Sequence, residues 1–227
     1  MKHDDEVTVE LPETVPVFPL PNTVLFPRTV LPLHIFEPRY REMTERALEG
    51  DGYIAMALRR VGGEEAGYHD VGCLGRISQS RRTEDGRYYV HLVGLQKVAF
   101  GDLVTDENSW LTAHIAPIDE EIPDDTEPGS HDDLVKLLGV CTVLFQEVSD
   151  RSFPMVSIKE GLPYEAVVNS ICFHIGLPVE VKQSLLEEDD LRDRCRRLTE
   201  FVNTYLQKIV LSRDADPEDD EDQELVN

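Results

Sequence analysis

Residues 15–40 read VPVFPLPNTVLFPRTVLPLHIFEPRY, and this stretch carries most of the information about the fold. It holds six of the chain's fourteen prolines and very few charges. Its apolar residues are typical of buried strands, but proline removes a backbone donor that a central strand needs. The two properties are compatible if the strands are short, lie at an edge or end in turns. We therefore predict that Pro21 and Pro27 bound a turn and that Pro38 opens a helix.

The residues around this stretch, from 14 to 118, have the composition of a β-rich domain. Three further runs (53–60, 72–104 and 110–118) carry β-branched and aromatic residues between turn signals. Within the second run, Asp85-Gly86 separates two strand-like halves, which is a strong signal for a β-hairpin. One helix is expected between Glu37 and Gly50, where Tyr40, Met43 and Ala47 repeat at helical spacing.

Beyond residue 133 the apolar period changes from that of strands to that of helices. Stripes with steps of three and four run from Leu134 to Val148, from Tyr164 to Ile175 and from Leu191 to Ile209, with a short segment between the last two. Helices with one apolar face must bury that face against each other or against the β half. We therefore expect an α+β protein with five parts, namely a flexible N-terminus (1–13), a β domain (14–118), an acidic linker (119–133), a helical bundle (134–211) and a disordered acidic tail (212–227).

The charge of the chain is strongly negative and unevenly distributed. The 227 residues carry a formal net charge of −23, and residues 119–133 and 214–227 each hold eight acidic residues and no lysine or arginine. Such blocks repel themselves and are expected to stay solvated. This distribution disfavours binding to nucleic acid, which depends on lysine and arginine. No apolar run is long enough for a membrane span, and the first residues lack the pattern of a secretory signal, so we expect a cytoplasmic protein that binds no membrane.

Candidate catalytic and metal-binding groups are scarce. The four cysteines form no C-x-x-C pair, and we expect them to be reduced, small apolar residues. His34, His91 and His114 fall in strand-like runs without a nucleophile or ligand nearby in sequence, and Cys172 and His174 are spaced to point to different helix faces. The paired carboxylates, including Asp189-Asp190, are expected to be solvated, with one of this last pair capping the final helix. The sequence therefore predicts no catalytic residue, no metal site and no cofactor.

Several motifs of the chain match one known family. The segment VPVFPLPNTVLFPRTVLPLHIFEPRYREM resembles the opening motif of the Lon N-terminal, substrate-binding domain. The segment from Gly72 to Phe100, including Gly94-Leu95-Gln96-Lys97, is similar to the hairpin region of that family, which often has arginine where this chain has Lys97. LPVEVKQSLLEEDDLRDRCRRLTEFV is similar to its C-terminal helices. The resemblance spans about residues 14–210.

The resemblance implies a PUA-like β pseudo-barrel followed by a helical bundle, in agreement with the β-then-α order of the periodicity. Full Lon proteases add an ATPase module and a Ser-Lys protease domain, whereas this sequence has no G-x-x-x-x-G-K-[ST] loop. We therefore expect a stand-alone, non-catalytic module related to proteolysis that binds unfolded or extended polypeptide segments. Phe26, Leu33 and Phe36 are the expected peptide-binding residues. The alternatives are a regulatory adaptor of a protease and a PUA-like RNA-binding module.

Overall fold

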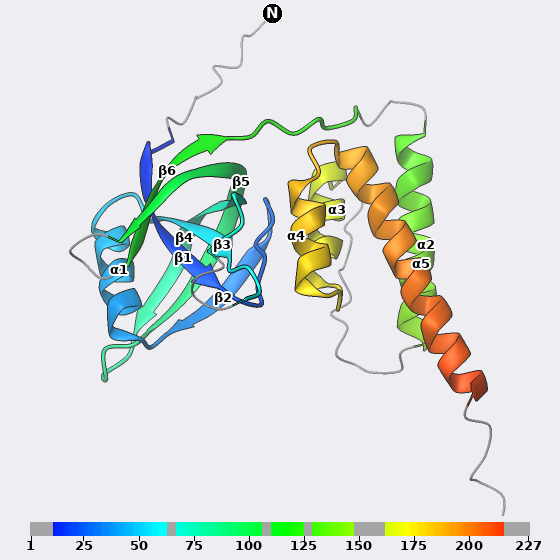
Figure 1. Ribbon diagram of the computed structural model, residues 1–227, viewed down its shortest axis with the longest axis horizontal. Helices are drawn as coiled ribbons and strands as arrows, with labels where there is room; N and C mark the ends of the chain where they lie inside the picture. The colour runs from blue at the N-terminus through cyan, green and yellow to red at the C-terminus, as the bar shows by residue number, and fades with distance from the viewer. Residues whose placement is uncertain (1–10, 63–66, 106–109, 125–128, 148–161, 216–227) are drawn as a thin grey trace, which may run out of the picture.

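The computed structural model describes residues 11–62, 67–105, 110–124, 129–147 and 162–215. It contains a β-sheet with one helix at the N-terminal side of the chain and a group of helices at the C-terminal side (Figure 1). The prediction of an α+β fold is confirmed. Most of the expected N-terminal segment and of the acidic tail lies outside the described residues, although the last helix continues to Ala215.

The sheet closes on itself through its longest strand. Its strands are β1 (Thr14–Leu20), β2 (Val30–Ile35), β3 (Tyr53–Leu58), β4 (Val71–Arg82), β5 (Tyr88–Thr105) and β6 (Leu111–Pro117). They are ordered β2-β5-β4-β3-β1-β6, and an additional pairing of β5 with β6 makes a closed ring of every strand except β2. Strand β2 pairs only with β5 among the described strands, so it forms an edge. Helix α1 (Pro38–Glu49) begins at the expected proline and packs Tyr40, Met43 and Ala47 against the sheet.

The two prolines of β1 are accommodated by a change of neighbour along the strand. Residues 14–17 pair with β6, and residues 17–20 pair with β3. Pro16 therefore has a ladder partner only on the β6 side and Pro19 only on the β3 side. Each proline has one side on which no backbone donor is required. We expected proline-containing strands to be brief, at an edge or next to a turn, and β1 is instead an internal strand whose two halves each have one free side.

Four helices follow the sheet. They are α2 (Ser130–Glu147), α3 (Tyr164–His174), α4 (Val179–Glu187) and α5 (Leu191–Ala215). The periodic stripes predicted three of them, and α2 begins four residues earlier than its stripe. The prediction of a cap by one of the two adjacent aspartates is confirmed for Asp190, which accepts hydrogen bonds from the backbone N–H groups of Arg192 (2.7 Å) and Asp193 (3.2 Å).

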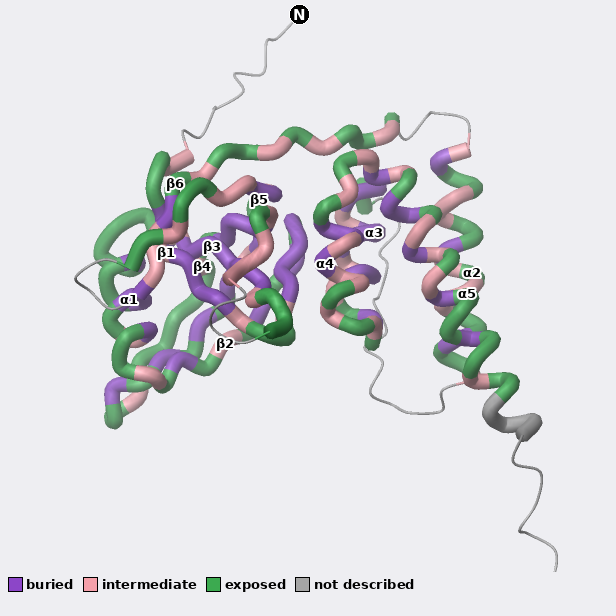
Figure 2. Tube along the Cα trace, in the orientation of Figure 1, coloured by how far each residue is buried: buried purple, intermediate pink, exposed green. Residues whose placement is uncertain are grey.

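A shared apolar cluster joins the sheet to the helices. Val24, Phe26 and Leu58 from the sheet side pack in one cluster with residues of α2 to α5. The buried segments shown in Figure 2 face each other across this junction. Arg28, whose backbone is left-handed with φ 63°, bonds Glu165 of α3 at 2.5 Å. The loop between β1 and β2 is therefore fixed to the helices at two points.

Buried charges accompany this apolar junction. The side chains of Lys97 and Arg194 are both fully buried, and both contact the carboxylate of Glu120, from Lys97 at 3.6 Å. Lys97 also bonds Asp189 at 2.6 Å, and Arg194 donates to Asn169 Oδ1 at 2.7 Å. We name Lys97, Glu120, Asp189 and Arg194 the junction network.

The expectation that acids of segment 119–133 stay solvated is wrong for two of them. The side chains of Glu120 and Asp133 are only 8% and 11% exposed. Glu120 belongs to the junction network, and Asp133 pairs with Arg192 and Arg196 of α5. Burial alone would raise the pKa of Asp133, but the hydrogen bond from Arg192 and the neighbouring cations hold that pKa below its ordinary value. Local charge density did not reveal the arginine partners of these acids, because Arg192, Arg194 and Arg196 lie about 60 to 75 residues away.

Candidate functional site: the outer face of β2, β5 and β4

The outer face of three neighbouring strands is exposed and carries no acid. Residues 30–36 (VLPLHIF), 76–82 (RISQSRR) and 88–94 (YYVHLVG) contain three arginines, two histidines and no aspartate or glutamate, in a chain of net charge −23. Strand alternation and register place one row of side chains from each strand on the same outer side. We name this surface the outer face; its members are Val30, Pro32 and His34 of β2, Tyr89, His91 and Val93 of β5, and Arg76, Gln79 and Arg81 of β4.

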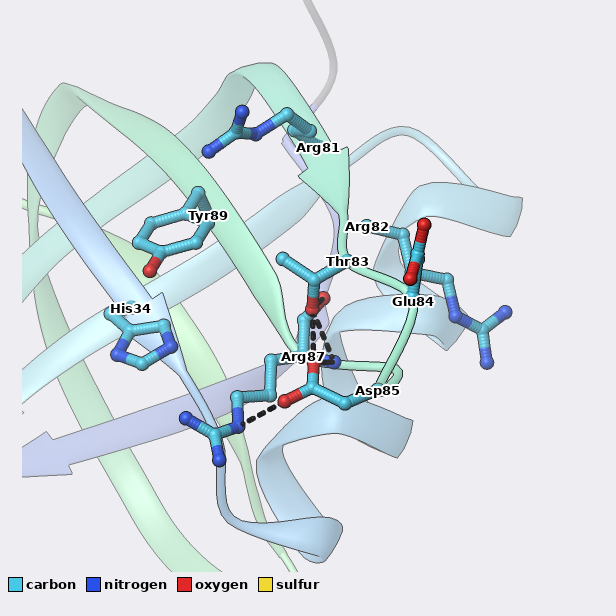
Figure 3. A pocket seen from close by; sticks show the side chains of 8 residues that line it. All are labelled: His34, Arg81, Arg82, Thr83, Glu84, Asp85, Arg87 and Tyr89. Carbon is cyan, nitrogen blue, oxygen red and sulfur yellow. Dashed lines mark hydrogen bonds and ion pairs between the residues drawn. The ribbon is translucent and has the colours of Figure 1, made fainter.

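Three side chains of the outer face form a stacked row across the strands. The register pairs His34 with Tyr89 and Arg81 with Tyr89. The imidazole of His34 stacks on the Tyr89 ring with centroids 4.6 Å apart and planes 10° from parallel. The Arg81 guanidinium lies 5.1 Å from the centre of the same ring. The row Arg81–Tyr89–His34 thus combines a cation with two flat rings and ends at the edge strand (Figure 3).

A hollow of about 560 Å³ lies along this row, next to the turn between β4 and β5. Its lining contains the three residues of the row and residues of the turn. Within the turn, the hydroxyl of Thr83 donates to Asp85 at 2.5 Å, and Arg87 pairs with Asp85 at 2.9 Å. The hydrogen bond from Thr83 holds the pKa of Asp85 below its ordinary value, and Arg87 adds to this effect. Asp85 is therefore ionised near neutral pH and its charge is balanced by Arg87.

The other basic residues near the hollow differ in what they contact. Arg82 forms an ion pair with Glu45 of α1 at 3.1 Å, so its positive charge is already neutralised by a residue outside the turn. Arg81 contacts the Tyr89 ring, and no carboxylate of the described residues pairs with it. Of the three arginines that line the hollow, Arg81 is the one without a carboxylate partner among the described residues, and it lies beside an exposed aromatic ring; Glu84 also belongs to the lining. This arrangement suits a ligand that brings both a negative charge and a flat or apolar side chain.

The predicted peptide-binding residues have three different environments. Phe26 is 0% exposed and belongs to the apolar cluster at the junction, so it does not lie at a surface. Leu33 is half-buried and packs against the cluster under β2. Phe36 is 58% exposed, directly after β2, with its ring centre 5.8 Å from that of His34. Of these residues, Phe36 is the one that continues the outer face.

No sequence motif pointed to Tyr89, and His34 was expected only to lack a catalytic or metal-binding partner. Tyr89 is 44% exposed and lies at the centre of the row. The hairpin signal at Asp85-Gly86 indicates that β4 and β5 pair, but a two-residue turn at this site would put Arg82 opposite Tyr89. The observed turn is one residue longer, with the N–H of Thr83 donating to the carbonyl of Arg87, and it puts Arg81 opposite Tyr89. Nothing in the sequence indicates that β2 pairs with β5, so the contact of His34 with Tyr89 could not be found in that way.

Cys172 and His174 do not form an activated catalytic pair. Burial raises the pKa of the Cys172 thiol to about 12, so it is not a thiolate at neutral pH. His174 contacts the backbone carbonyl of Ser170 at 2.8 Å. Within the described residues, no three histidine, cysteine or acidic side chains come close enough together to hold a metal ion. Nor does any helix in the described ranges combine the length and apolarity needed to cross a membrane.

Comparison with known families decides the relationship of the chain. The family model described as the ATP-dependent protease La (LON) substrate-binding domain matches residues 14–204. The chain belongs to this family. The match includes the sheet, the outer face and nearly all of the helices, so the outer face is a surface of a Lon substrate-binding domain.

Individual relatives give the same result. The chain is 29% identical over 212 residues to a Lon protease of Flavobacterium johnsoniae and 28% identical over 211 residues to Lon protease 2 of Syntrophobacter fumaroxidans. These alignments cover 90% and 89% of this chain, but the chain spans about a quarter (26%) of the length of each relative.

Solved structures of Lon N-terminal domains have the same fold. The N-terminal domain of a Lon protease from the Mycobacterium avium complex has a TM-score of 0.65 at 18% identity, and covers 84% of this chain and 98% of its own. A Lon N-terminal domain protein from Xanthomonas campestris has a TM-score of 0.60 at 19% identity, covering 82% and 96%. The prediction of a Lon-type domain from the motifs of residues 15–40 is confirmed.

Proposed function

We propose that this Lon substrate-binding domain recognises unfolded or extended polypeptide segments through its outer face and contributes binding rather than a chemical reaction. The observation that carries the proposal is the exposed row Arg81–Tyr89–His34, which ends at an edge strand. Aromatic and arginine side chains contribute most to binding energy at protein interfaces. The membership of the chain in a family of substrate-binding domains agrees with a polypeptide ligand.

Tyr89→Ala is expected to weaken binding of an unfolded protein by about tenfold, because it removes the ring on which both Arg81 and His34 pack. The probe is reduced, carboxymethylated α-lactalbumin, which remains unfolded in buffer, and binding is measured by fluorescence anisotropy.

The matched control is Tyr205→Ala on α5, because Tyr89 and Tyr205 are both 44% exposed. The control is expected to change the dissociation constant by less than about twofold. Equal effects of the two substitutions, or equal binding of native and unfolded α-lactalbumin, would contradict the proposal.

RNA binding is the second candidate, because exposed rings beside arginines are also the components of platforms that stack single-stranded bases. It predicts that single-stranded poly(U) binds the domain with an affinity that falls steeply with salt. Binding of poly(U) without binding of unfolded protein would replace the first proposal by this one. The net charge of −23 disfavours contact with a phosphate backbone, which carries a negative charge at every nucleotide.

A further inference from the structure

We propose that the bound segment adds to the sheet as a strand on the free edge of β2, and that it is acidic, with an aromatic side chain in register with His34. This inference rests on the proposed function and specifies the class of segment and the way it is held. Side-chain contacts alone would leave the direction and register of a bound segment open, whereas a strand on an edge fixes both.

The backbone of β2 has unused hydrogen-bonding groups on this edge. The N–H of Gly94 donates to the carbonyl of Thr29 at 2.8 Å, so these residues take a hydrogen-bonded pair position of the ladder through this one bond, while the N–H of Thr29 donates to the Phe26 carbonyl at 3.2 Å. Such pairs alternate along an antiparallel ladder, and the backbone groups of Val30, Pro32 and His34 therefore point away from β5. No described strand pairs with β2 on that side.

Proline in β2 shapes the edge without closing it. Pro32 has no N–H, so the edge offers N–H donors at Val30 and His34 and carbonyl acceptors at all three positions. An added strand with matching spacing can use these groups, and it must place no essential acceptor opposite Pro32. The missing N–H at Pro32 limits continuous pairing of a second sheet with β2. Proline on an edge strand is a common protection against edge-to-edge aggregation. A single peptide segment is compatible with the edge.

Charge complementarity identifies the segment as acidic. The strips 30–36, 76–82 and 88–94 contain no acid, and the charge of Arg81 is not balanced by any carboxylate of the described residues. The net charge of −23 repels an acidic segment at long range, so the preference for acid is a local one that comes from contact with the acid-free strips. Carboxylates on the outward side of the added strand would lie beside His34, whereas Arg81 is three strand spacings away, about 14 Å.

The row of stacked side chains identifies the aromatic position. Arg81, Tyr89 and His34 lie on three successive strands, and the next position of the row lies beyond the edge. An added strand would put one outward side chain directly beside His34, within the usual distance of cross-strand pairs. A flat ring at that position extends the stack by one member. Leu33 is half-buried on the inner side of β2, where it can contact one of the inward-facing apolar side chains of the added strand.

The test uses the intact chain and a fluorescein-labelled peptide of sequence EVEVWVEVE, with acids and tryptophan on one face and valines on the other. We expect it to bind at least about tenfold more tightly than KVKVWVKVK. In two further peptides, alternate backbone amides are N-methylated, on the odd or on the even positions. One set weakens binding by about tenfold or more and the other by less than about threefold, because only one set faces β2.

Substitution of His34 tests the register of the aromatic residue. His34→Ala removes the ring, which is exposed, and keeps the backbone of the edge. We expect this substitution to weaken the binding of EVEVWVEVE by about fivefold and that of EVEVAVEVE by less than about twofold. Such a difference would measure the coupling between the His34 ring and the tryptophan ring. Equal effects on the two peptides would show that the aromatic residue lies elsewhere.

The outcomes separate this inference from the proposed function. If unfolded α-lactalbumin binds but both N-methylated peptides bind like their parent, strand addition is wrong and the proposed function stands. If EVEVWVEVE binds no better than KVKVWVKVK, the acidic preference is wrong. If neither peptide nor unfolded protein binds, the proposed function fails together with the inference. Displacement of the peptide by poly(U) at equal charge concentration would overturn the choice of a polypeptide ligand.

Discussion

Arg194→Met is expected to lower the free energy of unfolding by about 3–5 kcal/mol, which is a large fraction of the stability of a domain. The Arg194 side chain is fully buried and contacts Glu120, Asn169 and the backbone carbonyl of Glu188. Its removal leaves the carboxylate of Glu120, only 8% exposed, with Lys97 at 3.6 Å as its remaining charged contact in the junction network. Urea unfolding followed by circular dichroism measures the loss.

The control for this experiment is Arg196→Met on the same helix. Arg196 also forms ion pairs, with Asp133 at 3.2 Å and Asp193 at 3.0 Å, but its side chain is 49% exposed. We expect a loss below about 1 kcal/mol, as is usual for exposed pairs. Adding Glu120→Gln to Arg194→Met should recover part of the loss, because no buried charge is then left poorly paired. Equal losses of unfolding free energy for the two single substitutions would show that the buried junction network stabilises the protein no more than exposed ion pairs do.

Gly94→Ala is expected to destabilise the protein by about 3 kcal/mol, at the upper end of the usual cost of inserting one methyl group. A Cβ atom at Gly94 would lie 2.1 Å from the carbonyl oxygen of Phe26, which is a backbone atom and cannot rotate away. The same stretch is held by hydrogen bonds of 2.8 Å from Gly94 to Thr29 and from Arg28 to Gly94. A shift of this loop would also displace Phe26 from the apolar cluster at the junction.

Gly139→Ala is the matched control, because nothing lies within 4 Å of a Cβ atom at that position of α2. Alanine in a helix interior is favoured over glycine, so the control should be more stable than the parent by about 0.5–1 kcal/mol. Thermal unfolding of both variants under the same conditions gives the comparison. Unchanged thermal stability of the Gly94→Ala variant would mean that the loop between β1 and β2 does not pack closely against β5.

The sequence predicts those parts of the fold that depend on local pattern. Pro38 at the start of α1, the turn at Asp85-Gly86 and the cap by Asp190 each follow from the residues within one turn. The helical stripes of α2, α3 and α5 depend on spacing alone. The neighbours of β1 could not be predicted in this way, because the halves of this strand pair with strands about 40 and 100 residues away.

The same distinction between local pattern and long-range pairing applies to the candidate site. The contact of Arg81 with Tyr89 lies within one hairpin but depends on a turn one residue longer than the Asp85-Gly86 signal predicts. The stacking of His34 on Tyr89 needs a pairing over 55 residues. Phe26 and Phe36 have similar apolar surroundings in the sequence, yet one is 0% and the other 58% exposed. Their difference arises from the helices that cover the loop between β1 and β2, and no local pattern carries that information.

Hydrogen–deuterium exchange in the presence and absence of reduced, carboxymethylated α-lactalbumin is the most direct test of binding at the outer face. We predict slower exchange of backbone amides in β2 and β5 within 30–36 and 88–94, and unchanged exchange in α2 and α5. Protection confined to the helices, or no protection at saturating unfolded protein, would contradict the assignment of the outer face as the polypeptide-binding surface.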